Sequence, residues 1–257
     1  MEKIRNANKD LKHLEERMTE YWGHRSESYS SQNMSQLFGE KKEVWENKIF
    51  SQIEEKKQMK ILDIGTGPGF FAILCALRGH EVTAVDMSKD MIEKAKKNAH
   101  LAGAEIRFME VGSRLPFDEA SFDLIISRDV TWTLTEPEKQ LKHWAMKLKP
   151  GGTMLYFDAE WYYYLRDENT KKQWEDRKEE IRRNGGYIYE KAVHLEAMAE
   201  KLPLTYVRRP LWDNAYWKGQ DAFSCEILEN LNGEIYSDIE QLQYDTFPEF
   251  LVSVRRG

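Results

Sequence analysis

The stretch ILDIGTGPGFF, residues 61–71, decides the fold. Its apolar start belongs to a run, KILDI, that is typical of a buried strand, and the run stops at a glycine-rich turn. The segment that follows, residues 70–79, reads as a helix ending at Gly79. A glycine-rich turn between a strand and a helix lets a ligand approach the backbone closely. The stretch therefore predicts a strand–turn–helix unit that binds a small molecule at the turn.

The alternation of short apolar strands and helices continues as far as Asp158. Four further strands are predicted, at residues 81–86, 105–111, 122–127 and 153–158. Ser88 can cap the helix after the second strand, and Thr135 and Glu138 fit a capping box for the helix after the fourth, which Pro150-Gly151-Gly152 would end. Strands that alternate with helices imply βαβ units and a mostly parallel sheet with helices on both faces.

The segments on either side of this core complete the predicted architecture. Helices are expected at residues 8–22, 40–57, 166–184 and 192–202, and an edge pair of strands at residues 223–228 and 250–256. The fold class is therefore α/β: a doubly wound, mostly parallel, seven-stranded sheet with an N-terminal helical lid and an inserted helical cap after strand five. We expect one domain over residues 1–257, made of N-terminal helices and lid (1–58), a ligand-binding core (59–158), the inserted cap (159–210), and a last helix with the edge strands (211–257).

Composition narrows the class of protein. The chain of 257 residues is 41% apolar and 32% charged, as in ordinary globular proteins. Its net charge of −6 disfavours nucleic acid as a partner, since nucleic-acid binders usually present a basic surface. Cys75 and Cys225 form neither a disulfide framework nor a metal-ligand spacing, which fits a reducing cytoplasm and no metal site. No stretch resembles a secretory signal or a membrane span, so a cytoplasmic protein is expected.

Two carboxylates accompany the glycine-rich turn. Asp63 stands just before it, at the carboxyl end of the first strand. Asp86 ends the second strand, where a carboxylate can bind both hydroxyls of a ribose. The dinucleotide fingerprint would need a third glycine where this chain has Phe70. The pattern therefore favours a ribose-containing ligand other than a nicotinamide dinucleotide, and makes a nicotinamide-dependent oxidoreductase the less favoured alternative.

Four motifs occur in order between Lys60 and Asp158: LDIGTGPG, AVDMS, LPFDEASFDLIIS and LKPGG. With them the chain resembles the Rossmann-fold (class I) S-adenosylmethionine-dependent methyltransferases, in the broad group that includes the ubiquinone/menaquinone type and other small-molecule methyltransferases. The resemblance implies S-adenosyl-L-methionine as cofactor, S-adenosyl-L-homocysteine as product, and transfer of a methyl group to a small-molecule acceptor by direct displacement. Two alternatives stay open: a cofactor-binding protein without its own turnover, and an RNA methyltransferase.

The resemblance also implies which residues bind the methionine part of the cofactor. Gly65, Thr66 and Gly67 would lie against it, and Asp63 would help to hold its amino group through the turn.

The nucleoside part would lie further along the sheet. By the same resemblance Asp86 would bind the ribose and Met87 would pack on the adenine. Gly112 and Ser113 would lie beside the adenine amino group. The family often has an acidic residue where this chain has Ser113, and a serine accepts a hydrogen bond more weakly.

The N-terminal segment EYWGHRSESYSSQ, residues 20–32, resembles the segment that closes over the cofactor in this group. The lid candidates are Tyr21, Trp22, Arg25 and Tyr29, and of these Tyr21 and Tyr29 are expected to bind the cofactor. The alternative is that these aromatic side chains only pack the first helix onto the domain.

The loop after the fourth strand should face the reactive group, because open α/β sheets bind ligands outside the carboxyl ends of their strands. In it, Arg128 could contact the cofactor carboxylate or an acidic substrate, or pair with a neighbouring carboxylate to fix the loop. A general base is needed only if the acceptor carries a proton. The candidates are Asp129, Tyr29 and His24.

Aromatic side chains suggest where the acceptor lies. Trp132 follows the fourth strand, and Trp161 and Tyr164 follow the fifth. Such side chains offer large rigid surfaces with polar tips, so these three are the predicted substrate-binding residues, with residues 159–210 as a roof. The alternative is that the cap uses them to pack on the sheet. The sequence leaves open the acceptor, the atom methylated and the oligomeric state.

Overall fold

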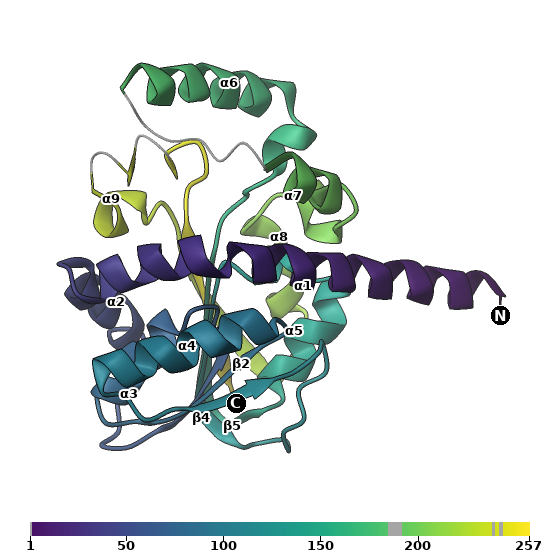
Figure 1. Ribbon diagram of the computed structural model, residues 1–257. Coiled ribbons are helices and arrows are strands. Elements are labelled where there is room, and N and C mark those ends of the chain that lie inside the picture. Colours follow the sequence, from purple (N-terminus) through teal and green to yellow (C-terminus); the bar gives the residue numbers. More distant parts are fainter. Residues whose placement is uncertain (1, 185–191, 238–239, 242–243) are drawn as a thin grey trace.

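The computed structural model describes residues 2–184, 192–237, 240–241 and 244–257 (Figure 1). Within these residues seven strands form one sheet of order β3-β2-β1-β4-β5-β7-β6. The strands are β1 (Lys60–Ile64), β2 (Glu81–Asp86), β3 (Arg107–Glu110), β4 (Phe122–Arg128), β5 (Leu148–Asp158), β6 (Phe223–Leu228) and β7 (Phe250–Arg256). The first five pair in parallel, and β7 pairs antiparallel with both β5 and β6. The predicted α/β fold is confirmed.

Helices cover both faces of this sheet because alternate strand residues point to opposite sides. On β1, Ile61 packs with the helices of one face and Leu62 with those of the other. The first face carries α2 (Lys41–Phe50), α3 (Phe70–Leu77), α4 (Lys89–Ala102) and α9 (Asn232–Ile235). The second face carries α5 (Pro137–Ala145) and α8 (Leu211–Lys218). The two apolar layers fix the sheet, and its edge at the carboxyl ends of the parallel strands is left for a ligand.

The remaining elements gather at that edge. They are α1 (Glu2–Leu37), α6 (Glu168–Arg183), α7 (Ala192–Ala199) and the short 3-10 turns η1 (Thr131–Thr133), η2 (Tyr163–Leu165) and η3 (Pro203–Tyr206). Figure 1 shows α6, α7 and α9 above the sheet, with α1 crossing between them and α4. The segment between β5 and α8 therefore forms the predicted cap, and α1 occupies the place predicted for a lid.

Three local predictions were wrong. The first helix, α1, extends well beyond residues 8–22 at both ends. Thr135 caps nothing, because its hydroxyl donates to Glu15 Oε1 of α1 at 3.0 Å. The predicted helix stop lies inside β5, where a Cβ on Gly152 would come within 3.0 Å of the Asp123 carbonyl oxygen of β4. Gly152 therefore serves the close approach of two strands rather than the end of a helix.

The edge strands and the helix that follows the second strand match expectation. β6 and β7 are antiparallel with β6 at the edge, although residues 229–249, including α9, join them in place of a tight turn. Ser88 Oγ accepts from Met91 N at the start of α4, and Gly103 ends that helix with φ 69°. Among the described residues, none of the helices combines the length and the apolar character needed to cross a membrane.

Candidate active site

A cavity opens at the carboxyl ends of β1, β2, β3 and β4, beneath α1. Its empty volume is about 1220 Å³, including the part open to solvent, which is enough for a cofactor of nucleoside size. The predicted cofactor-binding residues that line it are Tyr29, Asp63, Gly65, Thr66, Gly67, Asp86, Met87, Gly112, Ser113 and Arg128. Tyr21 is outside this lining and packs edge-to-face on Trp22, which does line the cavity. The structure thus brings together residues from four strand ends and α1.

Left-handed backbone allows the glycines of this turn to lie close to other elements, and two of them face the loop after β4 and α1. Gly65 has φ 66°, and a Cβ there would lie 2.3 Å from Val130 Cγ2, in the loop after β4. Gly67 has φ 52°, and a Cβ there would lie 3.6 Å from the ring of Tyr29. Because Gly65 has no side chain, the ends of β1 and β4 can lie in contact there. At Gly67 the ring of Tyr29, a lid candidate, lies directly over the turn.

Asp63 holds the glycine-rich turn by hydrogen bonds. Its Oδ2 accepts from Thr66 Oγ1 at 2.6 Å and from the backbone N–H of Ala72 in α3 at 3.1 Å. Burial raises the pKa of Asp63 to about 7, against the effect of these hydrogen bonds. The carboxyl group therefore joins the turn to the first turn of the following helix, which supports a role through the turn.

Asp86 joins the turn to the end of β2. Its Oδ2 accepts from Gly67 N at 2.9 Å and its Oδ1 from Ser88 N at 2.8 Å. Burial raises the pKa of Asp86, while these backbone hydrogen bonds oppose the rise. Each carboxylate oxygen has lone pairs beyond the one used here, so both can still accept from the two hydroxyls of a ribose.

The adenine end of the predicted site has apolar walls. Val85, Val111 and Leu115 line it, and the side chain of Met87 lies over it, 37% exposed. Leu115 N donates to His143 Nε2 at 3.2 Å, which holds the loop after β3 in place. Burial and the nearby Lys147 lower the pKa of His143, and so keep the ring neutral and able to accept this bond.

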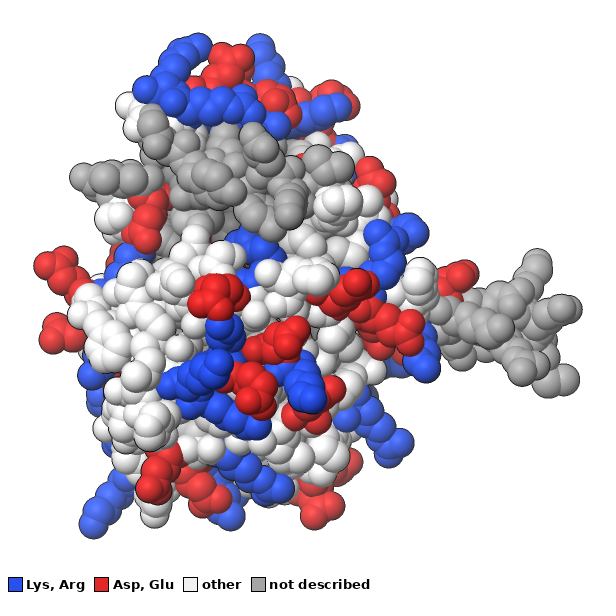
Figure 2. Space-filling model, in the orientation of Figure 1, with Lys and Arg blue, Asp and Glu red and all other residues white. Residues whose placement is uncertain are grey.

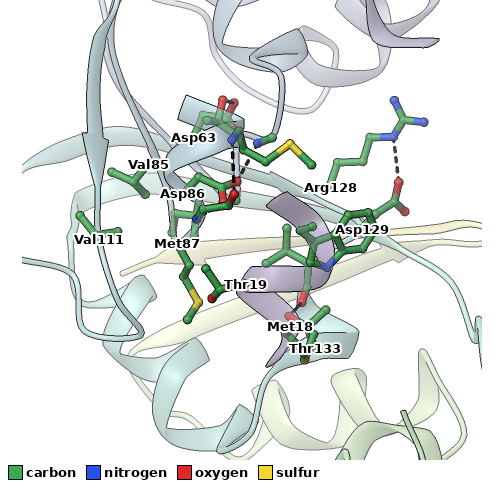
Figure 3. Close-up of a pocket in the computed structure, with 18 of the residues that line it drawn as sticks. Met18, Thr19, Asp63, Val85, Asp86, Met87, Val111, Arg128, Asp129 and Thr133 are labelled. Atoms are coloured by element: carbon green, nitrogen blue, oxygen red, sulfur yellow. Dashed lines mark hydrogen bonds and ion pairs between the residues drawn. The ribbon is translucent and has the colours of Figure 1, made fainter. Parts of the chain in front are cut away.

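On the opposite side of the cavity lie Arg128 and Asp129 (Figure 3). The Arg128 guanidinium stacks on Trp45 at 4.3 Å, donates to Gln36 Oε1 at 3.2 Å and approaches Asp129 Oδ2 at 3.4 Å. Burial alone would lower the pKa of Arg128, but the carboxylates of Asp129 and Glu249 raise it. The geometry thus shows the pairing with a neighbouring carboxylate that was the alternative to a ligand contact.

Asp129 is the general-base candidate that the structure presents most directly. Its left-handed backbone, φ 57°, turns the chain out of β4, and its N–H donates to Phe157 O at 2.9 Å. Burial and the charge of Asp158 raise its pKa to about 6, while Arg128 opposes the rise. Tyr29 also lines the cavity. His24 does not, because it lies on the solvent side of α1, 3.8 Å from Glu20 with its side chain 80% exposed.

The three predicted substrate-binding aromatics lie outside the lining of this cavity. Trp132 Nε1 donates to the Asp129 carbonyl oxygen at 3.0 Å, and Trp161 Nε1 donates to Asp158 Oδ1 at 3.0 Å. Tyr164 is buried against Phe247 in the cap. Their contacts are those of the packing alternative, in which the side chains join the cap to the strand ends.

Sequence reasoning missed two groups of lining residues. One is a face of α1 and the other comes from η1 and α5; together they are Glu15, Met18, Thr19, Asn33, Thr133, Leu134, Gln140 and Trp144. The available signal was the helical spacing of Leu14, Met18 and Tyr21, which predicts a buried face without saying what it covers.

Comparison with known proteins identifies the matching part of the chain. Residues 62–156 match the family model described as a methyltransferase domain. The demethylmenaquinone methyltransferase of Thermus thermophilus is 30% identical over 117 residues, which are 44% of this chain and 53% of that protein. A ubiquinone biosynthesis O-methyltransferase of Coxiella burnetii is 31% identical over 40% of this chain and 46% of its own length. The chain thus spans about half the length of the curated relatives it matches.

Solved structures extend the likeness in fold over most of the chain. A putative S-adenosyl-L-methionine-dependent methyltransferase of Methanococcus maripaludis superposes with a TM-score of 0.58 at 20% identity, covering 91% of this chain and 93% of that one. The phosphoethanolamine N-methyltransferase 2 of Haemonchus contortus, bound to S-adenosylhomocysteine, gives 0.57 at 18% identity over 82% of this chain and 52% of that one. The chain therefore has the Rossmann-like fold of S-adenosylmethionine-dependent methyltransferases, and its residues 62–156 match the methyltransferase-domain model.

Proposed function

We propose that this protein transfers a methyl group from S-adenosyl-L-methionine to a small molecule. The observation that carries the proposal is the cavity at the glycine-rich turn, where Asp86 and the turn lie inside the matched methyltransferase domain. Acidic and basic side chains alternate over the face drawn in Figure 2, which supports a small acceptor rather than nucleic acid. The cysteines Cys75 and Cys225 are free thiols, which supports a cytoplasmic location.

The chemistry asks for position more than for reactive side chains. The sulfonium of the cofactor supplies the methyl group, and the protein supplies orientation and a dry pocket. Holding donor and acceptor in line can contribute about 7–11 kcal/mol. Gly65, Thr66 and Gly67 would bind the methionine part and Asp86 the ribose, while Tyr29 would cover the turn from α1. Asp129 would accept the proton of an acceptor that carries one.

We expect Asp86→Ala to weaken binding of S-adenosylhomocysteine by roughly 1.5–3 kcal/mol, about ten- to a hundredfold, because charge-assisted hydrogen bonds to the ribose are lost. Isothermal calorimetry measures this directly. Asp118→Ala is the control, since Asp118 is exposed and lies away from the cavity lining. Equal affinities for wild type and Asp86→Ala would refute the ribose assignment.

Turnover is a separate question from binding. Wild-type protein incubated with methyl-labelled S-adenosylmethionine and a metabolite extract should label a small molecule that mass spectrometry can identify. Tight binding of S-adenosylhomocysteine without any labelled product would favour the alternative of a cofactor-binding protein without turnover.

A further inference from the structure

Three carboxylates stand at neighbouring strand ends on the ligand side of the sheet. Asp129 follows β4, Asp158 ends β5, and Glu249 precedes β7. The strand register pairs Arg128 with Phe157 and Asp158 with Phe250. The three carboxylates therefore lie in a row along one edge of the sheet. The row begins beside the glycine-rich turn, since Val130 approaches Gly65.

Asp158 is fully used by the protein. Its oxygens accept from five donors, which are Thr131 Oγ1, Trp132 N, Ala159 N, Trp161 Nε1 and Arg209 Nη1. Arg209 also binds Asp213, and these charged side chains are at most 1% exposed. Asp158 is therefore a structural carboxylate that joins the cap to the sheet.

The two outer acids differ from Asp158. Among the described residues, Asp129 Oδ1 and Glu249 Oε1 are buried and have no hydrogen-bond partner. Glu249 is 0% exposed, and its other oxygen accepts from the hydroxyl of Tyr236. A buried carboxylate oxygen without a donor is costly, so a group that supplies donors there would be bound favourably.

Two carboxyl groups share one neighbouring guanidinium. Arg128 lies between them electrostatically, but its guanidinium hydrogen-bonds Gln36 and stacks on Trp45. One guanidinium can balance only one of the two carboxylates, and without a further cation Glu249 keeps its proton up to a pKa of about 8. A cation bound beside the row would favour ionisation of both acids.

Tyrosine rings complete the surroundings. Tyr236 stacks on Tyr244 at 4.7 Å beside Glu249 and already has Lys41 Nζ 5.0 Å from its ring. Tyr29 lies near Asp129 and Glu249, and its ring covers Gly67. Ring faces of this kind attract cations. Tyr29 and Asp129 line the cavity, so a cation held by this group of residues would lie next to whatever the glycine-rich turn binds.

We propose that Asp129, with Tyr29 beside it in the cavity lining and the buried Glu249 in the same row of strand ends, binds the cationic nitrogen of the methyl acceptor, which is therefore an amine. The inference rests on the proposed function. In the step it implies, an ammonium N–H proton passes to a carboxylate, and the freed nitrogen lone pair forms the new N–C bond. The S–C bond breaks with its electron pair going to sulfur, which becomes a neutral thioether, and the positive charge reappears on the methylated nitrogen beside the two acids.

The cofactor also carries an ammonium group, on its methionine part, and the experiment must separate this source from the acceptor. A metabolite extract is divided by cation exchange at neutral pH into a retained and an unretained pool, and each is incubated with methyl-labelled S-adenosylmethionine. We expect label only in the retained pool, on a nitrogen identified by fragmentation. Label confined to the unretained pool, or on oxygen or carbon, would overturn the proposal. Label in neither pool would overturn the proposed function and this inference with it.

Variants locate the cation within the site. Asp129→Asn and Glu249→Gln keep the shape of each side chain while removing its ability to ionise, and Glu226→Gln on the exposed side of β6 is the matched control. With the amine product identified, we expect each of the first two to lower kcat/KM for that amine by about tenfold or more, with affinity for S-adenosylhomocysteine within about twofold of wild type. Loss of S-adenosylhomocysteine affinity in both variants would show that the acids bind the cofactor's own ammonium group, and would overturn the assignment to the acceptor.

Discussion

Arg209→Met should lower the free energy of unfolding by about 3–5 kcal/mol, because it leaves Asp158 and Asp213 buried without their cation. Arg209 binds Asp158 Oδ2 at 3.0 Å and Asp213 Oδ1 at 2.7 Å, and each of the three side chains is at most 1% exposed. Tyr156 donates to Asp213 as well, so the loss would spread into the layer of β5 and α8.

Arg208 provides the control for that measurement. It is the next residue in the chain, but its side chain is 54% exposed and its ion pair with Glu160 is 3.4 Å long. Exposed pairs contribute about 0–1 kcal/mol, so Arg208→Met should change stability little. Thermal unfolding should separate the two variants by on the order of 10 °C in Tm. Similar Tm values for both would mean that the buried ion pairs do not hold the cap to the sheet.

Glu249→Gln should act in the opposite direction and stabilise the protein. Burial, with the charge of Asp129, raises the pKa of Glu249 from 4.5 to about 8, although Arg128 and the Tyr236 hydroxyl oppose the rise. The folded state then holds a proton that the unfolded state has already lost between these two pH values. Stability therefore falls as the pH rises from about 4.5 to about 8.

A glutamine cannot ionise, so it removes this cost. We expect the variant to exceed wild type by about 2–4 kcal/mol at pH 8 and by little at pH 4.5. Chemical denaturation at several pH values measures the difference, with Glu226→Gln as the control for the loss of one surface charge. A gain in the free energy of unfolding that does not depend on pH, or a lower value at pH 8, would contradict the assignment of a raised pKa to Glu249. The other groups near Glu249, among them Asp158 and Tyr29, are unchanged in the variant.

The fold between Lys60 and Asp158 could be predicted because its signals are local. Each strand there is a short apolar run, and the turns between them carry glycines or a capping Ser88 that act on their immediate neighbours. Thr135 was misassigned for the opposite reason. Its partner, Glu15, lies 120 residues away in the chain, and no local pattern announces such a pair.

In the candidate site, too, residues with a local sequence signal could be predicted, whereas residues positioned by long-range contacts could not. The glycine-rich turn and Asp86 are recognisable from their places at strand ends, and the structure puts them in one cavity. Glu249 has no signal in the sequence, since an acid that stands just before a strand ordinarily faces water. Its burial follows from the pairing of β7 with β5 and from α9, which are long-range contacts. Trp132 N and Trp161 Nε1 donate to Asp158, a partner that only the folded chain reveals, and their role as substrate contacts stays a prediction.

The order of the candidate site residues along the sequence has a consequence for how the protein is synthesised. Tyr29 comes from the beginning of the chain, and Glu249 stands beside a strand that ends at Arg256. The segment from Lys60 to Leu148, which holds the glycine-rich turn and Asp86, is therefore synthesised long before β7 can pair with β5. During that interval the row of carboxylates still lacks Glu249. Under the proposed function, the part of the site proposed for the cofactor is thus made before the part proposed for the acceptor is complete.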